Sequence, residues 1–173
     1  MEGRTTFWRV VLDTSVLLGP DRREVVTAAY LHYYVGFWST WIAAEFARKR
    51  TEWVAERAIR DRCGPGELRR RLAESRNHVN AALAEFFRVL QAVNHTDAPD
   101  ADLSWLTDLD DRPVIQTALA ARADILLTEN ATDFPIGDAR NGILILSARS
   151  FLRALYERFP EAETAVREYL QAM

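Results

Sequence analysis

The feature that most constrains this chain is a short apolar run that ends abruptly in a carboxylate. Val10, Val11 and Leu12 form a run too short for a helix, and their composition favours a strand buried on both faces. Asp13 follows directly, and a carboxylate at the end of a buried strand requires a hydrogen-bond donor or a cation. In open α/β sheets, ligands bind at the carboxyl ends of the strands. Asp13 is therefore either part of a functional site or the cap of the next turn.

Helical and strand patterns alternate along the rest of the chain. Apolar residues at helical spacing mark the helices, and Gly or Pro residues separate the segments. The predicted helices span 24–35, 41–62, 67–87, 114–123 and 147–158, with a last helix from 160. Gly36 is expected to end the first helix, and Asn141-Gly142 to form a turn. The predicted strands are 10–12, 37–38, 89–93, 125–127 and 143–146.

The two longest predicted helices carry an excess of basic residues. From Arg48 to Arg76 the chain has 10 basic and 5 acidic residues, so this segment has a formal charge of +5, and the remainder −8. Cys63-Gly64-Pro65-Gly66 separates the two helices, which we expect to form a hairpin. Such charges form either a solvated face or a surface for RNA or a partner protein.

Composition indicates a packed globular protein. Of the 173 residues, 49% are hydrophobic, which argues against a disordered chain. No apolar run approaches the roughly 20 residues needed to span a bilayer, and residues 1–6 lack the apolar segment of a signal peptide. A single cysteine, Cys63, excludes an internal disulfide and a cysteine-cluster metal site. We therefore expect a cytoplasmic protein with one domain over 1–173.

Acidic residues at three further positions are candidates for a shared site. Glu45 borders the apolar face of helix 41–62 and is wrongly spaced to close a capping box, although a solvated glutamate is the simpler interpretation. Asp110 or Asp111 precedes the helix that begins near Pro113, where the helix dipole keeps a carboxylate ionised. Asp133 lies in the polar segment after strand 125–127.

With these acids in this order, the chain resembles PIN domains, in particular the VapC-type toxins of bacterial toxin–antitoxin pairs. The similar motifs are residues 11–16, 41–45, 111–118 and 123–135, and the resemblance covers about residues 9–150. It implies a three-layer α/β/α fold with a central parallel sheet of four or five strands. The helical hairpin, at about 41–90, would be inserted within this domain and is longer than in the shortest VapC-like chains.

The resemblance also implies a metal-dependent ribonuclease that hydrolyses RNA phosphodiester bonds. Asp13 and Asp111 would be the main ligands of Mg²⁺ or Mn²⁺, which prefer oxygen donors. Glu45 and Asp133 would complete the catalytic and metal site, directly or through water. The candidate donors that would orient these acids are Ser15, Thr128 and Asn130.

Finer details of the motifs separate neighbouring candidates. Ala118 matches the small residue of the motif, seven positions after its acid, which favours Asp111 over Asp110. Some relatives carry an acid at the position of Asn130, so here Asp133 alone would supply charge at that edge. Asp124 stands at the entry of its strand, so we expect a structural role for it.

The expected partners are RNA, a cognate antitoxin and a second copy of the chain, with no membrane. Arg69, Arg70 and Arg71 are candidate RNA-binding residues, because an acidic site repels RNA unless other cations hold it. One alternative is a non-catalytic PIN-like module for RNA binding or scaffolding. Another is a phosphotransfer enzyme with Asp13 as nucleophile, although Ser15 stands where haloacid dehalogenase-like phosphatases carry a second aspartate.

Overall fold

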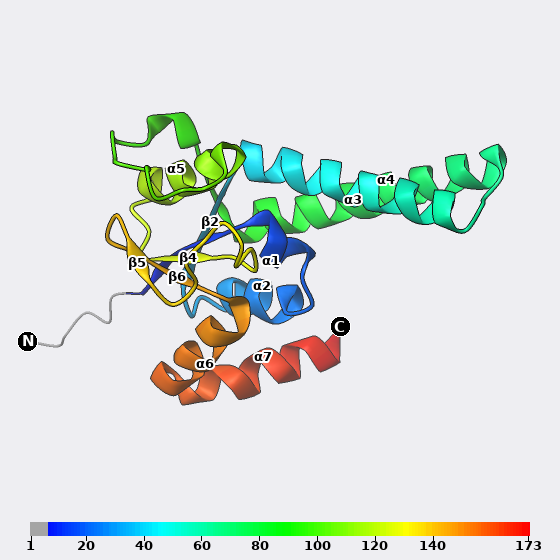
Figure 1. Ribbon diagram of the computed structural model, residues 1–173. Coiled ribbons are helices and arrows are strands. Elements are labelled where there is room, and N and C mark those ends of the chain that lie inside the picture. The colour runs from blue at the N-terminus through cyan, green and yellow to red at the C-terminus, as the bar shows by residue number, and fades with distance from the viewer. Residues whose placement is uncertain (1–6) are drawn as a thin grey trace, which may run out of the picture.

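The computed structural model describes residues 7–173 as an α/β body from which a long helical hairpin projects (Figure 1). The strands are β1 (Arg9–Leu12), β2 (Val35–Ser39), β3 (Gln91–Val93), β4 (Ile125–Leu127), β5 (Ala139–Arg140) and β6 (Ile143–Leu146). The helices are α1 (Thr14–Leu18), α2 (Arg22–Tyr30), α3 (Thr40–Arg60), α4 (Pro65–Val89), α5 (Arg112–Ala120), α6 (Ala148–Arg158) and α7 (Pro160–Ala172), with 3-10 helices η1 (His95–Asp97) and η2 (Leu109–Asp111). The signal-peptide prediction concerns residues 1–6, which lie outside the described residues.

The strands form one sheet in the order β3-β2-β1-β4-β6-β5. The first five are mutually parallel, and only β5 is antiparallel to its neighbour β6. At the centre, Val11 pairs with Phe37 of β2 on one side and with Leu126 of β4 on the other. The strand order reverses between β1 and β4, which is where an open α/β sheet forms its ligand crevice. Asp13 follows β1 at this point.

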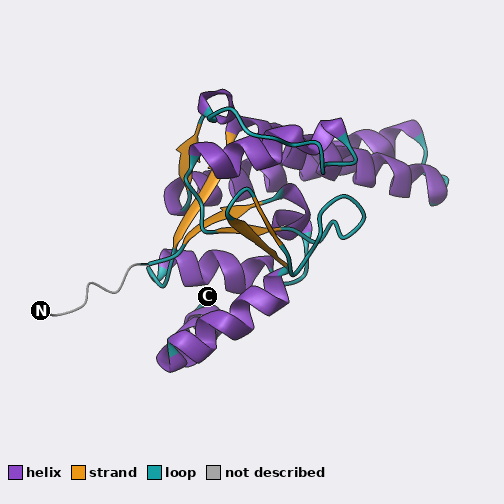
Figure 2. Ribbon diagram, turned by 60° about the vertical axis from the view of Figure 1, so that its left-hand side comes forward, coloured by secondary structure: helices purple, strands orange, loops and turns teal. Residues whose placement is uncertain are grey.

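Helices cover both faces of the sheet, which gives three layers (Figures 1 and 2). α5 packs on one face and contributes the buried Val114, Ile115 and Ala118. α2, α6 and α7 pack against one another on the other face, where Phe151 and Leu155 are fully buried. The predicted α/β/α fold with a parallel sheet of four or five strands is therefore confirmed, and β5 is an additional edge strand.

The predicted helix over 24–35 is too long at its carboxyl end. α2 ends at Tyr30, and His32 adopts a left-handed backbone with φ of 63°. Gly36 does not end the helix but lies inside β2. A Cβ on Gly36 would lie 2.5 Å from Cδ2 of Leu90, so glycine allows β2 to approach the end of α4. The helical pattern continued past the true end because this strand is also apolar.

The edge strand β5 arises from a two-residue hairpin. Asn141 and Gly142 both adopt left-handed φ angles, 53° and 78°, as an Asn-Gly turn between antiparallel strands requires. Arg140 consequently pairs with Ile143 across the hairpin. The sequence predicts the turn, but two residues of strand are too few to give an alternating pattern.

The hairpin of α3 and α4 is anchored to the body by aromatic side chains at its base. α3 begins as predicted, with Oγ of Ser39 accepting a hydrogen bond from the amide of Ile42 at 3.3 Å. The buried ring of Phe86 on α4 packs edge-on against Trp38 of β2 and Phe46 of α3, with centroids 5.7 and 5.3 Å apart. Among the described residues, no helix is both long enough and apolar enough to cross a bilayer.

We expect Phe86→Ala to destabilise the protein by about 3–5 kcal/mol, the usual loss for removing a buried phenyl ring. Phe86 is fully buried at the junction of hairpin and sheet, so its removal leaves a cavity. Phe87→Ala is the comparison on the same helix: Phe87 also contacts Trp38, with centroids 4.6 Å apart, but it is 56% exposed, so its removal leaves no closed cavity and should cost less. Urea denaturation of both variants measures the difference, and equal losses would contradict this account of the junction.

Candidate metal centre

Asp13 is a buried carboxylate held by three donors. It is 5% exposed, and its Oδ1 accepts a hydrogen bond from the amide of Thr14 at 2.6 Å. Its Oδ2 accepts from the hydroxyls of Ser15 at 2.7 Å and Thr128 at 2.8 Å. Burial raises the pKa of Asp13 above its usual range, and the bonds from Ser15 and Thr128 act against that shift. The side chain thus caps α1 and also links β1 to the neighbouring strand.

The loop after β4 is fixed to this carboxylate by the same hydroxyls. Oγ of Ser15 accepts from the amide of Glu129 at 2.9 Å, and Oγ1 of Thr128 accepts from the amide of Asn130 at 3.1 Å. The side-chain amide of Asn130 then donates to Asp111 at 3.1 Å and to Asp133 at 2.9 Å. A neutral side-chain amide therefore holds two carboxylates in place.

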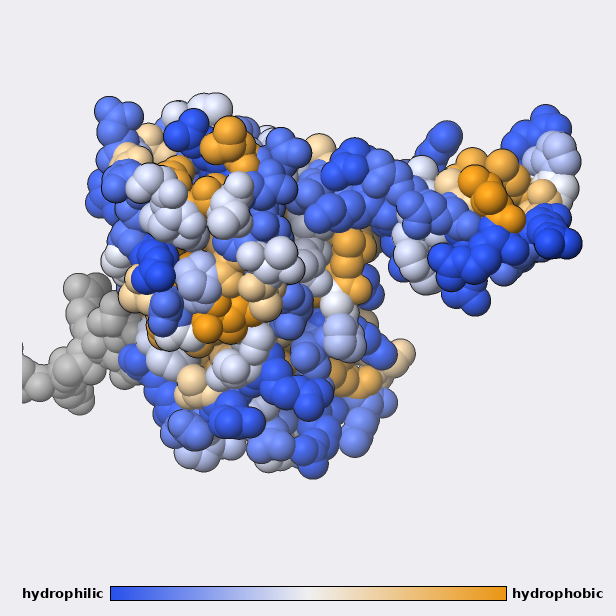
Figure 3. Space-filling model, in the orientation of Figure 1, coloured by the Kyte–Doolittle hydropathy of each residue, from blue (hydrophilic) through white to orange (hydrophobic). Residues whose placement is uncertain are grey.

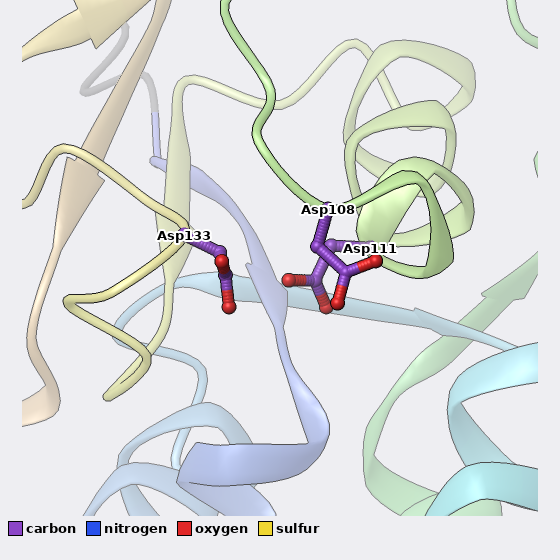
Figure 4. Close-up of side chains that lie close together, drawn as sticks. All are labelled: Asp108, Asp111 and Asp133. Carbon is purple, nitrogen blue, oxygen red and sulfur yellow. The ribbon is translucent and has the colours of Figure 1, made fainter.

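Three acids meet beside this loop (Figure 4). One carboxylate oxygen from each of Asp108, Asp111 and Asp133 lies within 4.8 Å of the others. Figure 4 shows that Asp108 and Asp111 come from the turn before α5, whereas Asp133 comes from the loop after β4, across from them. Asp133 also accepts a hydrogen bond from the hydroxyl of Thr107 at 3.1 Å. Two of the four acids predicted from the sequence, Asp111 and Asp133, belong to this group.

Asp108 was not predicted from the sequence as a site residue. Asp108 caps η2, with its Oδ1 accepting from the amide of Asp110 at 2.9 Å. The amide of Asp111 donates to the carbonyl of Asp108 at 3.3 Å, the hydrogen bond across three residues typical of a 3-10 turn, which brings the two residues close together. Asp110 is exposed and is not in the group, whereas Asp111 is. Its spacing of three residues from Asp111 is the sequence feature that could have identified Asp108 as a site residue.

The environment of Asp111 disfavours its charged form. Partial burial, followed by the negative charges of Asp13 and Asp133 and then by those of Asp108 and Glu45, raises the pKa of Asp111 to about 6. The two predicted acids outside the group of three, Asp13 and Glu45, are therefore close enough to act on Asp111. A bound cation would relieve this repulsion.

Glu45 lies beside the site but already has partners. One carboxylate oxygen accepts from the hydroxyl of Thr14 at 2.8 Å, which joins Glu45 to the residue after Asp13. The other oxygen lies 3.0 Å from Nζ of Lys49 and 3.7 Å from the guanidinium of Arg48. The side chain is only 11% exposed. Glu45 is thus not a solvated glutamate, and cations on its own helix balance its charge.

The arginines predicted to bind RNA lie far from these acids. Arg71 pairs with Asp61 at 2.7 Å, and Arg70 pairs with Glu67 and Glu74 at 2.8 and 3.0 Å. At about 1.5 Å per residue, Asp61 is roughly 24 Å along α3 from Glu45. Arg69 is exposed, and its Nε lies 3.4 Å from the Pro65 carbonyl. RNA binding by these arginines stays a prediction.

The donor set fits a hard divalent cation. Asp108, Asp111 and Asp133 offer only oxygen ligands, and one or two carboxylates with several waters are typical of Mg²⁺ and Mn²⁺ sites. Asp13 is oriented by its hydrogen bonds and contributes negative charge next to this group. Asp124, by contrast, accepts from the amide of Arg9 at 2.8 Å at the opposite end of β1, which is a structural role.

Comparison with known proteins does not assign a family. No protein-family model, curated protein or solved structure matches the chain. The similarity to PIN domains is therefore a prediction from the motifs alone.

The pKa of Asp111 predicts how stability without metal depends on pH. Its folded-state value of about 6 exceeds the ordinary value of 3.8, so the folded state binds the proton more tightly. In chelator, this residue makes the free energy of unfolding decrease as pH rises from about 4 to about 6. Asp111→Asn should remove that decrease and raise the melting temperature at pH 7 by about 2–4 °C per kcal/mol relieved.

Melting curves in chelator from pH 4 to 8, for the wild type and for Asp111→Asn, measure this effect. Asp110→Asn removes the same charge from an exposed position and serves as the control. Parallel stability profiles for the wild type and Asp111→Asn would contradict the raised pKa.

Proposed function

We propose that this protein is a PIN-type endoribonuclease that hydrolyses RNA phosphodiester bonds with bound Mg²⁺ or Mn²⁺, as the toxin of a toxin–antitoxin pair. The observation that supports it most is the convergence of Asp111, Asp133 and Asp108 beside buried Asp13, where partial burial and then the neighbouring negative charges raise the pKa of Asp111. This arrangement stands at the switch point of a parallel sheet, where α/β enzymes bind ligands. RNA as substrate follows from the resemblance.

In this proposal, the acids have separate tasks. A divalent cation, when bound, supplies an acidified water and neutralises charge on the phosphate. Asp111, Asp133 and Asp108 would hold it, and Asn130 keeps the first two carboxylates facing the same point. Asp13 would act as a ligand or through an ordered water, from a position that Ser15 and Thr128 fix.

Glu45 would complete the site through water rather than by direct contact. Its two oxygens already face Thr14 and Lys49, so it is positioned to accept a hydrogen bond from a water near the acids. Lys49 would then stand where the phosphate backbone approaches, and could exchange its contact with Glu45 for one with RNA.

The contacts of Asp13 argue against one alternative function, and the contacts of Glu45 favour the other. A phosphotransfer enzyme needs a free carboxylate oxygen for attack on phosphorus, but both oxygens of Asp13 accept hydrogen bonds and the residue is 5% exposed. A non-catalytic RNA-binding module is favoured by the pairing of Glu45 with Lys49, which leaves this acid balanced without metal. Cleavage assays with metal separate this second alternative from the nuclease.

The proposed nuclease would have macromolecular partners and a defined compartment. RNA is the substrate, a cognate antitoxin would control the activity, and a second copy of the chain would form a homodimer. The cytoplasm is the compartment that we propose, since cellular RNA is found there. The presence of an antitoxin gene beside this one would test the regulatory part independently of the chemistry.

We expect Asp13→Asn and Asp111→Asn each to abolish metal-dependent RNA cleavage while the fold persists. Both changes remove a charge from the site, and Asp111 has an oxygen within the group that would hold the cation. Loss of one such ligand or orienting acid should lower the cleavage rate by at least about 10–100-fold. Cleavage of a labelled RNA by purified variants in Mg²⁺ measures it, with circular dichroism to verify folding.

Asp110→Asn is the matched control for this experiment, because Asp110 adjoins Asp111 but is exposed and outside the group. It should retain cleavage close to that of the wild type. A wild-type cleavage rate in either Asp13→Asn or Asp111→Asn would refute the assignment of that residue.

Metal binding should also stabilise the folded protein, because the acids converge only in the folded state. At a free Mn²⁺ concentration 100 times the dissociation constant, the gain is about 2.7 kcal/mol. We expect the melting temperature to rise between chelator and millimolar Mn²⁺ in the wild type and in Asp110→Asn. The rise should be absent when Asp111 and Asp133 are both replaced by Asn, and an equal rise there would place the metal elsewhere.

A further inference from the structure

A ridge of α3 leads away from the acid cluster along the hairpin. Glu45, Lys49, Trp53 and Arg57 follow one another at four-residue steps, so their side chains form a continuous row on the helix. The row begins at the ion pair between Glu45 and Lys49, 3.0 Å long, at the edge of the acidic site. It ends at Arg57, within the segment 48–76 that carries the excess of basic residues. Lys49, Trp53 and Arg57 are all exposed.

An aromatic ring flanked by two arginines lies in the middle of this row. Trp53 is 48% exposed, although an indole of this size is usually buried in a core. The guanidinium carbons of Arg50 and Arg57 lie 5.0 and 5.5 Å from its ring centroid. Both distances are in the cation–π range. The three side chains together form a stacking surface with positive charge.

Neither of these two arginines forms an ion pair with a carboxylate of the described residues. Within residues 7–173, no carboxylate lies within 4.0 Å of the guanidinium of Arg50 or Arg57, whereas Arg70 and Arg71 each have such partners. Arg60, Arg62, Arg69 and Arg76, elsewhere on the hairpin, also have no carboxylate within 4.0 Å among the described residues. What distinguishes Arg50 and Arg57 from them is the exposed ring of Trp53, which both guanidinium groups contact.

The surface beside Arg50 is hollowed in three adjoining places. A cavity of about 320 Å³ between α3 and α4 is lined by Arg50, Arg57 and Arg71, and by Ser75 and His78. Asp61 and Glu74 also line it, but each pairs with an arginine. A second cavity of about 520 Å³ and a third of about 390 Å³ share Arg50 and extend to Leu18, at the end of α1.

A buried hydroxyl in the first cavity lacks a partner. Ser75 is 4% exposed, and its Oγ makes no hydrogen bond. Leaving a buried hydroxyl unpaired costs free energy, so such a group commonly marks a position that a ligand or water fills. Beside Arg50 and Arg57, the hydroxyl can donate to an oxygen of an anion.

We propose that this hairpin face binds single-stranded RNA and leads it to the acid cluster. Arg50 and Arg57, with the Ser75 hydroxyl, would bind phosphates, an unpaired base would stack on Trp53, and Lys49 would contact the phosphate nearest the site. The claim that the strand reaches the acids rests on the proposed nuclease function. The claim of RNA binding does not.

The combination of groups favours a single strand over other occupants. Cations that follow a backbone, together with an exposed ring for an unstacked base, form the usual binding surface for single-stranded nucleic acid. A duplex keeps its bases stacked internally and would leave Trp53 without a role. The face thus differs from the sequence-predicted Arg69, Arg70 and Arg71, of which Arg70 and Arg71 already hold carboxylates. Figure 3 shows the projecting hairpin as largely hydrophilic, apart from an apolar patch toward its tip.

The test measures binding separately from cleavage. All proteins carry Asp111→Asn and are kept in chelator, and the probes are a fluorescent single-stranded RNA and the duplex of the same sequence. Arg50→Gln with Arg57→Gln removes the two unpaired cations of the face. Arg149→Gln with Arg153→Gln removes two exposed arginines of α6, for an equal change in net charge. Trp53→Ala and Trp53→Phe separate loss of the ring from its conservative replacement.

We expect the Arg50/Arg57 pair to bind the single strand more weakly than the α6 pair. Its plot of log affinity against log salt should be flatter by about 1.4, because each of two phosphates left without its arginine lowers the slope by about 0.7. Trp53→Ala should weaken binding by about fivefold or more, the loss of one stacked base, and Trp53→Phe should retain most of it. The duplex should bind more weakly and be insensitive to Trp53.

Equal affinities and slopes for the two arginine pairs would overturn the proposal, as would equal binding of single strand and duplex. A shift in oligomeric state on gel filtration of Trp53→Ala, with RNA affinity unchanged, would assign the face to a second copy of the chain and also overturn it. If binding behaves as expected but the wild type cleaves no RNA in Mg²⁺, the nuclease function fails and the binding face stands.

Discussion

The site depends on how the carboxylate of Asp13 is kept at the end of the central strand. Burial disfavours its ionised form, and donors from neighbouring segments offset that cost: the amide of Thr14, the hydroxyl of Ser15 and the hydroxyl of Thr128. β1 and β4 flank the reversal in strand order, so these bonds span the crevice that the topology opens. The loop that carries Asn130 is positioned through the same hydroxyls.

The fold was predictable from the sequence where burial dictated the pattern. Strands such as β1 and β4 are buried on both faces, so each appears as an unbroken apolar run, and Ser39 marked the start of α3. The predicted boundaries were wrong where a helix and the next strand form one continuous apolar pattern. The apolar residues of β2 follow directly on the apolar pattern of α2, so Gly36 was predicted to end the helix. Its role is instead to allow the close contact with Leu90.

The site was predictable in part, for a similar reason. Carboxylates at strand ends and helix starts can be recognised in the sequence, and Asp111 and Asp133 do lie together. Asp108 was missed because its position depends on the 3-10 turn that places it next to Asp111. The pairing of Glu45 with Lys49 was also missed, although spacing of four on a helix allows it. The periodicity of apolar residues shows which face of a helix is buried. The net charge of its exposed face depends on which side chains form ion pairs, and the sequence does not show that.

That distinction matters most for the basic hairpin, where a count of charges gives an incomplete account. The excess of five positive charges between Arg48 and Arg76 predicts a phosphate-binding surface without locating it. Pairing with Asp61, Glu67 and Glu74 offsets charge toward the tip, where an exposed ion pair contributes little to stability but still competes with phosphate. Arg50 and Arg57, beside Trp53, form no ion pair within residues 7–173 and lie nearer the acids than Arg70 and Arg71. An acidic centre that must accept a polyanion requires cations that carboxylates do not already hold. Arg50 and Arg57 meet this requirement, and they also flank an exposed ring on which a base can stack.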